Sequence, residues 1–377
     1  MSRNVDQGQG MYDRIALMTS KARWVVSVGG TVLCTAVLMV AGTVSAASTQ
    51  QSGLVDVGLV VFDPGIPADQ STHSQRGIFP EIRTAEAKYM PVVLRQVLIE
   101  SGDWGVVRVL PEVLDSSELL VTGTILQSDG LRLQLRINAR DASGVEWLNR
   151  VYSGSTRSTD YPVSVPGDPY LGLYQQIADD LVAVRRQKNA KQLTTIQDIA
   201  LMRYAIQLAP TVFGSYLTQT PEGRYVLVRF PAEGDPMLAR VIRIRNQEYL
   251  FIDTVDEQYE HLSEEMAPTY NLWRQYGAEQ AIYQGEYQER VASRGAQGRR
   301  GSFTALEQSY NTYKWSKIHE QDLDELALGF NNEVAPTVMD VSGAVVELSG
   351  TLDSQYSEWR DILQRIFTLE TGLPPAS

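Results

Sequence analysis

Cysteine and histidine are almost absent from this chain. Its 377 residues include one cysteine, Cys34, and three histidines, His73, His261 and His319. Cys34 lies in an apolar amino-terminal run, so the rest of the chain has no thiol for a disulfide, a cysteine nucleophile or a thiolate metal site. The histidines are far apart in sequence, which argues against a histidine-based metal site. We therefore expect neither a metal nor another cofactor.

Positive charge is also scarce. Lys and Arg number 33 against 45 Asp and Glu, which gives a net charge of −12. Binding to nucleic acid needs clustered Lys and Arg to neutralise phosphates, and the chain has no long basic run, so we predict no nucleic-acid partner. Hydrophobic residues make up 43% of the chain, enough for well-packed cores. At roughly 150 residues per domain, the length suggests two or three domains.

Motifs of common enzyme classes are missing as well. The chain has no Gly-x-Ser-x-Gly elbow, no Ser-x-x-Lys pair and no glycine loop for phosphate. The segment from His319 to Leu323 fails the zinc-protease pattern because Leu323 stands where the second histidine would be. We predict that the protein is not an enzyme. A hydrolase that uses two distant carboxylates remains the alternative.

The amino terminus has the pattern of an export signal. Lys21 and Arg23 precede an apolar run over residues 24–41, and small residues follow up to Ala47. This pattern predicts a signal peptide over residues 1–46, cleaved after Ala46 or Ala47, and hence a periplasmic protein. The alternative is an uncleaved anchor in the inner membrane over residues 24–47. An exported chain without cysteine in its body favours the periplasm of a Gram-negative bacterium.

Residues 50–188 read as an α/β domain with the order β-α-β-β-β-β-α. The apolar run Val55–Phe62 is typical of a central strand, and the helix before Gly102 has an apolar face. Asp129-Gly130 predicts a hairpin turn. Beyond it, apolar and polar residues alternate over residues 131–138, which predicts a strand with one wet face. The other strands are predicted at residues 106–110, 119–126 and 145–152, and the last helix follows Asp168-Pro169.

This domain resembles the amino-terminal domain of TolB and its relatives among bacterial envelope proteins, the FlgO-type and CsgG-like proteins. The resemblance is carried by VVFDPG, VVRVLPE and LLVTGTILQSDGLRLQLRINARDASGVEW, with Asp141, Ser143, Gly144 and Trp147 in the last turn. It implies a mixed sheet that docks partners or assembles into rings. A sheet edge that accepts another strand is the physical counterpart. The lipobox of the lipoproteins is missing, and nothing downstream reads as a β-propeller.

Residues 189–255 are predicted to form a helix, Thr194–Leu208, and a small antiparallel β meander. The four predicted strands are Phe213–Leu217, Tyr225–Phe230, Leu238–Arg245 and Tyr249–Thr254. Together with Arg229, the residues Arg240, Arg243 and Arg245 make this the most basic region of an acidic protein. Alternation would place Arg243 and Arg245 on one sheet face, where they meet an acidic partner or cell-wall carboxylates. A solvated sheet face is the other interpretation.

Residues 256–370 are predicted to be helical, as a helical hairpin or coiled-coil-like region. The first helix contains many tyrosines and Trp273, Gly295–Ser302 forms a turn, and a capping box of Thr304 and Glu307 starts the second helix. Apolar residues at alternating spacings of 4 and 3 then predict a long third helix. This seam consists of Val334, Val338, Val341, Val345, Leu348, Leu352, Gln355, Trp359, Ile362 and Ile366. It packs either inside the chain or between copies in a homo-oligomer.

Together these patterns predict an α+β protein: a mixed-sheet TolB-like domain, a small β meander and a long helical hairpin or bundle. We expect a non-enzymatic periplasmic accessory or scaffold that docks envelope proteins of a secretion, flagellar, pilus or cell-wall synthesis machine. One alternative binds or hydrolyses peptidoglycan, and another is a coiled-coil structural oligomer. The candidate interaction residues are Arg240, Arg243, Arg245, Trp273, Val338, Val345, Leu352 and Trp359.

Overall fold

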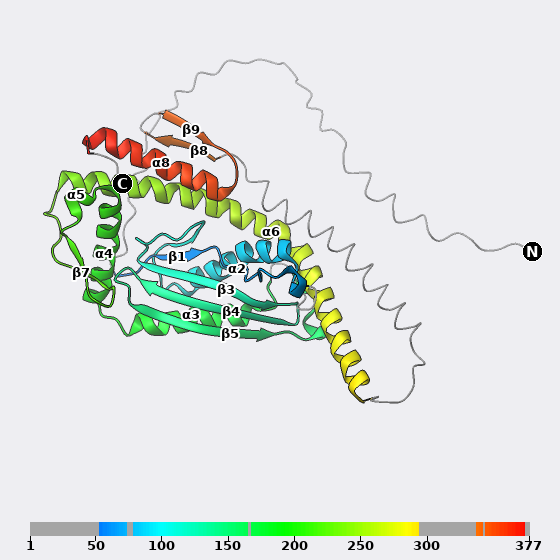
Figure 1. Cartoon of the computed structure of the whole chain (residues 1–377). Coiled ribbons are helices and arrows are strands. Elements are labelled where there is room, and N and C mark those ends of the chain that lie inside the picture. The colour runs from blue at the N-terminus through cyan, green and yellow to red at the C-terminus, as the bar shows by residue number, and fades with distance from the viewer. Residues whose placement is uncertain (1–52, 74–77, 165–166, 294–336, 342–343, 374–377) are drawn as a thin grey trace, which may run out of the picture. The chain divides into compact units, whose positions relative to one another are not determined.

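A mixed five-stranded sheet organises the computed structural model, which describes residues 53–73, 78–164, 167–293, 337–341 and 344–373 (Figure 1). The strand order is β2-β1-β3-β4-β5. β1 runs parallel to both of its neighbours, and β3, β4 and β5 are antiparallel. The strands are β1 (Val57–Val60), β2 (Val107–Leu110), β3 (Leu119–Ser128), β4 (Arg132–Asp141) and β5 (Glu146–Ser155). The protein is therefore mixed α/β, and the element order predicted for residues 50–188 is confirmed.

Two helices, α2 (Pro80–Ser101) and α3 (Leu171–Arg186), pack against each other on one face of the sheet. α2 ends at Gly102, whose φ of 67° is the left-handed cap that the sequence predicts. α3 lies against β5, where the Tyr152 hydroxyl donates a hydrogen bond of 2.7 Å to Asp180. Two short 3-10 turns, η1 (Gln70–Thr72) and η2 (Ser158–Asp160), lie in the connections.

Helix α4 (Ala190–Leu208) confirms the predicted helix after the sheet domain. It starts at a capping box in which the side chains of Asn189 and Gln192 each accept a hydrogen bond from the other's backbone N–H. A short helix, α5 (Pro210–Phe213), and a hairpin of β6 (Leu217–Gln219) and β7 (Tyr225–Leu227) follow. The second strand of the predicted meander thus exists in shortened form. The first, Phe213–Leu217, is wrong in its bounds, because Phe213 ends α5 and β6 begins only at Leu217.

The last two predicted strands of the meander are wrong, because both lie in α6 (Pro236–Ser293), a helix of 58 residues. Asp235 caps its start by accepting from the N–H groups of Met237 and Leu238. Apolar and polar residues alternate only briefly around Arg243, whereas apolar residues at helical spacing continue over a longer stretch and are buried. They are Leu238, Val241, Ile244, Phe251, Ile252, Val255 and Tyr259.

The amino-terminal part of the predicted long helical seam is also wrong. Its residues form a hairpin of β8 (Thr337–Val341) and β9 (Ala344–Leu348), and only α8 (Leu352–Thr371) is helical. β-branched residues such as Val338 and Val345 favour strands, and repeated valines satisfied the 4-3 spacing by coincidence. Gly350, with a φ of 106°, separates the two elements, and the Thr351 side chain caps α8.

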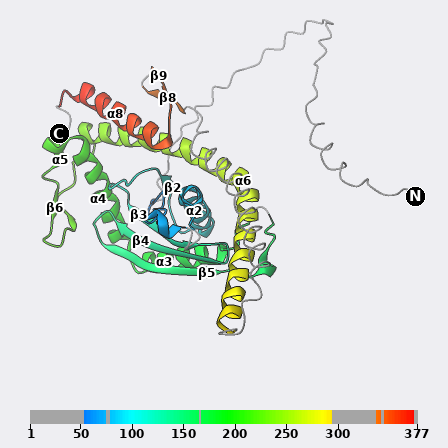
Figure 2. The same cartoon turned by 45° about the vertical axis from the view of Figure 1, so that its right-hand side comes forward.

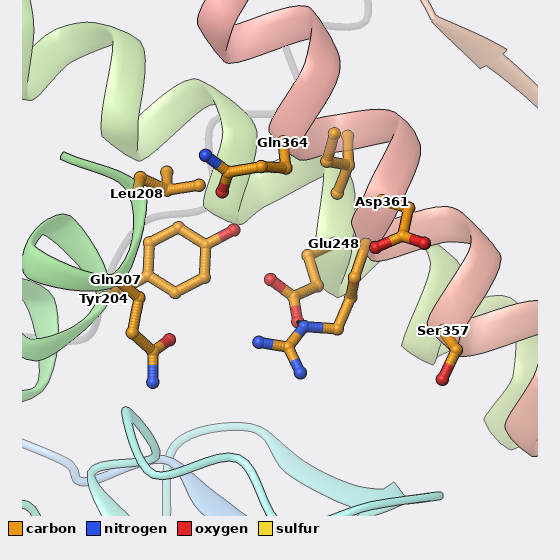
Figure 3. A pocket seen from close by; sticks show the side chains of 9 residues that line it. Tyr204, Gln207, Leu208, Glu248, Ser357, Asp361 and Gln364 are labelled. Atoms are coloured by element: carbon orange, nitrogen blue, oxygen red, sulfur yellow. Dashed lines mark ion pairs between the residues drawn. The ribbon is translucent and has the colours of Figure 1, made fainter. Parts of the chain in front are cut away.

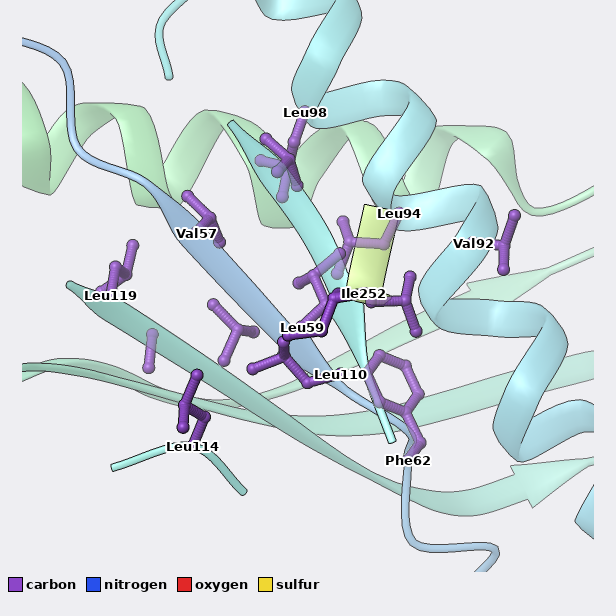
Figure 4. Packing of buried hydrophobic residues seen from close by; sticks show 14 of the residues in the cluster. Val57, Leu59, Phe62, Val92, Leu94, Leu98, Leu110, Leu114, Leu119 and Ile252 are labelled. Atoms are coloured by element: carbon purple, nitrogen blue, oxygen red, sulfur yellow. The ribbon is translucent and has the colours of Figure 1, made fainter. Parts of the chain in front are cut away.

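Helix α6 ties these parts to the sheet, running first under α8 and then past β2 and α2 (Figure 2). Ile252 of α6 lies close to Leu59 of β1 and Leu94 of α2 (Figure 4). All three side chains are fully buried. On the other side of α6, Phe251 stacks on Trp359 of α8 with ring centroids 6.0 Å apart. The core is therefore continuous from the sheet through α6 to α8.

Several predictions fall outside the described residues. These are the export signal over residues 1–46, its alternative as an anchor over residues 24–47, the turn Gly295–Ser302 and the capping box of Thr304 and Glu307. Within the described ranges, no helix is long and apolar enough to cross a membrane. The described residues belong to one compact unit that spans Gln50–Ser377.

Candidate functional site

The three arginines predicted to form an interaction surface do not share one. On a helix, residues two positions apart point to different sides, so the predicted common face of Arg243 and Arg245 is wrong. Arg243 is exposed and pairs with Glu370 of α8. Arg245 is buried, and its Nε donates a hydrogen bond of 2.8 Å to the Tyr249 hydroxyl. Arg240 is half-buried and donates to the backbone oxygen of Pro236 at 3.4 Å.

The predicted apolar candidates divide into packed and exposed residues. Leu352 and Trp359 are buried against α6, in agreement with the interpretation that this part of the seam packs inside the chain. Trp273 stacks on Tyr270 with centroids 5.9 Å apart. By contrast, Val338 and Val345 are 62% and 72% exposed on the outer side of the β8–β9 hairpin. Val338 and Val345 therefore do not pack in the helical seam that the sequence predicts.

The sheet edge formed by β2 is closed by side chains from two helices. Asp256 of α6 accepts a hydrogen bond of 3.0 Å from the backbone N–H of Val109. Arg95 of α2 donates from Nε to the backbone oxygen of Val107 at 3.1 Å, and the same Nε lies 3.3 Å from Asp256. Burial raises the pKa of Asp256 to about 7. The outward backbone N–H of Val109 and C=O of Val107 are thus hydrogen-bonded within the chain.

A second group of charges fastens α6 beside this edge. Arg108 of β2 makes a two-pronged contact with Asp253, at 2.6 and 3.2 Å, and its guanidinium lies 4.2 Å from the centre of the Tyr249 ring. Nearby, the Glu118 carboxylate accepts from the backbone N–H of Asp56 at 2.9 Å. Burial, together with the charge of Asp56, raises the pKa of Glu118 to about 7. The contacts of Arg108 with Asp253 and Tyr249 thus hold α6 against the sheet.

The opposite sheet edge, formed by β5, has a side that no other described residue pairs with. β5 is ten residues long, and within the described ranges it pairs only with β4. The backbone N–H of Thr156 donates to the oxygen of Leu131, so alternate residues from there, including Tyr152 and Arg150, face β4. The backbone groups of Val151, Ser153 and their alternates point away from the sheet. We call this free side the open edge.

A line of arginines follows the neighbouring strand on the exposed face. Arg132, Arg136 and Arg140 of β4 are exposed, whereas the alternating apolar residues of β4 are buried against the helices. In the part of the chain that the structure describes, none of the three forms an ion pair. We call them the arginine row. The arginines could be seen in the sequence as polar positions of the alternating strand. The sequence predicted only that this face of the strand is wet.

The side chains of β5 beside the arginine row are short and uncharged over most of its length. In the β4–β5 register, Ser155 lies opposite Arg132, and Val151 lies opposite Arg136. Glu146 lies opposite Arg140, and its carboxylate instead accepts from the side-chain amides of two asparagines at 3.0 and 3.3 Å. The open edge therefore lies one strand away from a row of positive charge, and over most of its length the side chains between them are small.

A polar cavity of about 430 Å³ lies between α4, α6 and α8 (Figure 3). Glu248 of α6 is buried in its wall and accepts a hydrogen bond of 2.6 Å from the Tyr356 hydroxyl. Arg360 of α8 places its Nε 3.5 Å from the same carboxylate oxygen. The lining residues are Tyr204, Gln207, Leu208, Glu248, Ser357, Arg360, Asp361, Leu363 and Gln364.

Among the described residues, no group of three or more His, Cys, Asp or Glu side chains could hold a metal ion. Comparison with known proteins adds no assignment, since no protein-family model, curated protein or solved structure matches the chain. The open edge with its arginine row and the polar cavity are thus the two sites on which a functional argument can be based.

Proposed function

We propose that this protein is a non-enzymatic accessory or scaffold of the bacterial cell envelope that docks a partner protein at its open edge. The occupant is an extended, acidic segment of the partner, which adds a sixth strand beside β5. The observation that carries the proposal is the difference between the two edges of one sheet. One edge is closed by Asp256 and Arg95, whereas no described segment pairs with the outer side of the ten-residue edge at β5.

Free edges of this length are unusual in proteins. An unpaired strand presents a row of N–H and C=O groups that pair readily with another chain, and natural proteins shorten, bulge or cover such edges. Strand addition obtains its affinity from these main-chain hydrogen bonds. The outward-facing groups of Val151, Ser153 and Ser155 provide consecutive positions for them.

The arginine row selects the charge of the added strand. Neighbouring strands are about 4.8 Å apart, so the new strand lies two strand spacings from β4. Arg132 and Arg136 are long, and the side chains opposite them on β5, Ser155 and Val151, are short. The guanidinium groups therefore extend across β5 towards acidic side chains of the incoming strand, where bidentate contacts strengthen the pairing.

The cellular setting of the proposal rests on sequence patterns. The residues that resemble the TolB-like envelope domains fall in β1, β2 and the β3–β4–β5 hairpins, and those families dock partners. The apolar run after Arg23 and the small residues before Ala47 support export to the periplasm. We propose both the TolB-like fold and the periplasmic location on these grounds.

A site-specific crosslinking experiment tests the proposal. A photoreactive benzophenone amino acid is placed at Val151 on the open edge, or at Val113 as the control, because both valines are about equally exposed (44% and 53%). After irradiation in native envelopes, we expect residue 151 to crosslink to an acidic segment of one partner. Replacing Arg132, Arg136 and Arg140 together by Gln should abolish this crosslink.

The matched control for charge replaces Arg229, Arg243 and Arg365 by Gln. These arginines are also exposed, but they lie after β7, on α6 and on α8, outside the five-stranded sheet, so their loss should leave the crosslink unchanged. Equal crosslinking from both valine positions, or a crosslink that survives loss of the arginine row, would contradict the proposal. A crosslink to β5 of a second copy would replace it with self-pairing in a homo-oligomer.

A further inference from the structure

The cavity between α4, α6 and α8 has the size of a small-molecule site and lies apart from the open edge. Its volume of about 430 Å³ falls within the range of natural ligand pockets. Tyr204, Glu248 and Gln364 lie around one space, although they come from three helices (Figure 3). Only two apolar side chains, Leu208 and Leu363, belong to the lining. A lipid-like ligand would therefore leave most of these polar groups unpaired.

The buried charge in the wall is compensated, although the lining has two acidic residues and one basic residue. Glu248 is only 2% exposed, and its carboxylate is compensated by Arg360 and by the Tyr356 hydroxyl. Hydrogen bonding to Glu248 also involves Tyr204, whose pKa is raised by burial and by this carboxylate. An anion entering the cavity would be repelled by Glu248 and Asp361. A cation would be repelled by Arg360 and would find Glu248 already paired, so that only the exposed Asp361 would attract it. An uncharged ligand avoids both repulsions.

The remaining polar groups both donate and accept hydrogen bonds. Gln364 extends into the wall with a buried Nε2 that has no hydrogen-bond partner. Gln207 supplies a second amide, and Ser357 supplies a hydroxyl. A side-chain amide has a hydrogen-bond donor and an acceptor side by side. Sugar hydroxyl groups also both donate and accept, so they can pair with both groups of an amide. Burying an unpaired amide costs free energy, and rotation of the Gln364 amide towards a ligand hydroxyl or acetamido oxygen would recover it.

We propose that this cavity binds a small, uncharged saccharide, with Gln364 and Gln207 as the residues that hydrogen-bond its hydroxyl or acetamido groups. The ring of Tyr204 supplies the aromatic wall, and Glu248 is kept in place by Tyr356 and Arg360. This inference goes beyond the docking function and does not depend on it, because no residue of the cavity belongs to β4 or β5.

Saturation-transfer NMR on the full chain tests the proposal. The probes are N-acetylglucosamine and its β-1,4-linked dimer, with glutamate as an anionic and putrescine as a cationic comparison. We expect saturation transfer to the sugars, and about tenfold weaker binding after Gln364→Leu, which removes one amide. Gln96→Leu makes the same replacement at an exposed glutamine outside the cavity, so it should bind as the unmodified protein does.

Each outcome decides the question. Gln207→Leu provides a second lining variant if Gln364→Leu fails to fold, and thermal unfolding of each variant establishes that it is folded. The proposal is overturned if neither sugar receives saturation, if both folded lining variants bind sugar normally, or if glutamate or putrescine binds more tightly. Binding of the dimer but not of the free sugar would identify glycan chains as the source of the ligand and would support the proposal.

Discussion

The two edges of the sheet differ in how they treat their backbone groups. At β2, Asp256 and Arg95 take up the outward N–H of Val109 and C=O of Val107. At β5, nothing in the described chain pairs with the outward side, although that strand is more than twice as long. The shorter edge is thus closed by a costly set of buried charges, while the longer one is left free. Closure is therefore specific to one edge.

The two edges also differ in how much they contribute to the stability of the fold. The closed edge belongs to the core, since α6 buries Ile252 and Val255 while its carboxylates contact β2. The open edge carries mainly short and polar side chains. We expect changes at the closed edge to act on folding and changes at the open edge to act on binding. The following predictions test this division, in order of decreasing effect.

The largest effect is expected from pH, because it acts on two buried carboxyl groups beside β2. The pKa values of Asp256 and Glu118 are raised to about 7 from their ordinary values of 3.8 and 4.5. The folded protein therefore binds these protons more tightly than the unfolded chain does. Its free energy of unfolding should fall as the pH rises from about 4 to about 7 and then level off.

Urea denaturation at a series of pH values measures this dependence. The double variant Asp256→Asn, Glu118→Gln cannot ionise at either position, so its stability should change much less over the same range. A free energy of unfolding that instead increases between pH 5 and 7 would show that two nearby positive charges outweigh burial. These are Arg95, 3.3 Å from Asp256, and Arg245, 4.0 Å from Glu118.

Truncating Ile252 should loosen the contact between α6 and the sheet. This side chain is fully buried beside Leu59 and Leu94 (Figure 4). We expect Ile252→Ala to lower the free energy of unfolding by about 3 kcal/mol, through lost burial and the cavity left behind. Ile242→Ala on the exposed side of the same helix should cost no more than about 0.5 kcal/mol. Similar losses in both variants would argue that α6 does not stabilise the sheet.

Removing the Asp256 carboxylate should leave the N–H of Val109 without a partner. We expect Asp256→Ala to lower the free energy of unfolding by about 2 kcal/mol and to speed hydrogen exchange at Val109. Asp256→Asn keeps an acceptor oxygen and should cost less. Glu260→Ala removes an exposed partner of Arg95, so its cost should stay below about 1 kcal/mol. Unchanged exchange at Val109 in Asp256→Ala would mean that β2 is protected by packing alone.

The smallest effect on stability is expected at the open edge. Val151→Lys should change the free energy of unfolding by no more than about 0.5 kcal/mol, because the side chain is exposed and its backbone has no outer partner. Its cost should appear in partner binding instead. In the unmodified protein, hydrogen exchange should be faster at Val151 and Ser153 than at Tyr152 or Val109. Strong protection of Val151 would indicate that this edge is already covered.

The elements of the sheet could be predicted because their patterns are local. Leu133, Leu135 and Ile137 alternate with polar residues, and the structure buries every one of them. The open edge could not be predicted in this way. It follows from the strand order, in which β1 pairs between β2 and β3 and the antiparallel strands extend from β3, and this pairing depends on contacts distant in sequence.

The errors arose where a short pattern competed with a longer one. Arg243, Ile244 and Arg245 alternate like a strand, but Asp235-Pro236 is a helix start and the buried positions continue at helical spacing to Tyr259. The prediction for the residues of the β8–β9 hairpin was wrong for the opposite reason. There a long 4-3 spacing predicted a helix and obscured a local run of β-branched residues. The polar cavity had no sequence signal, since its residues come from three helices.

The closure of β2 by α6 also sets an order of events on the ribosome. Val109 is synthesised 147 residues before Asp256, its hydrogen-bond partner. During that interval the sheet strands already exist as nascent chain, but the β2 edge lacks α6 and has only Arg95 of α2 to cover it. Unpaired strand edges make partly folded chains prone to aggregate. Synthesis of α6 then completes the closure of the β2 edge. Chaperone protection of the nascent chain should therefore matter most before residue 256 has emerged.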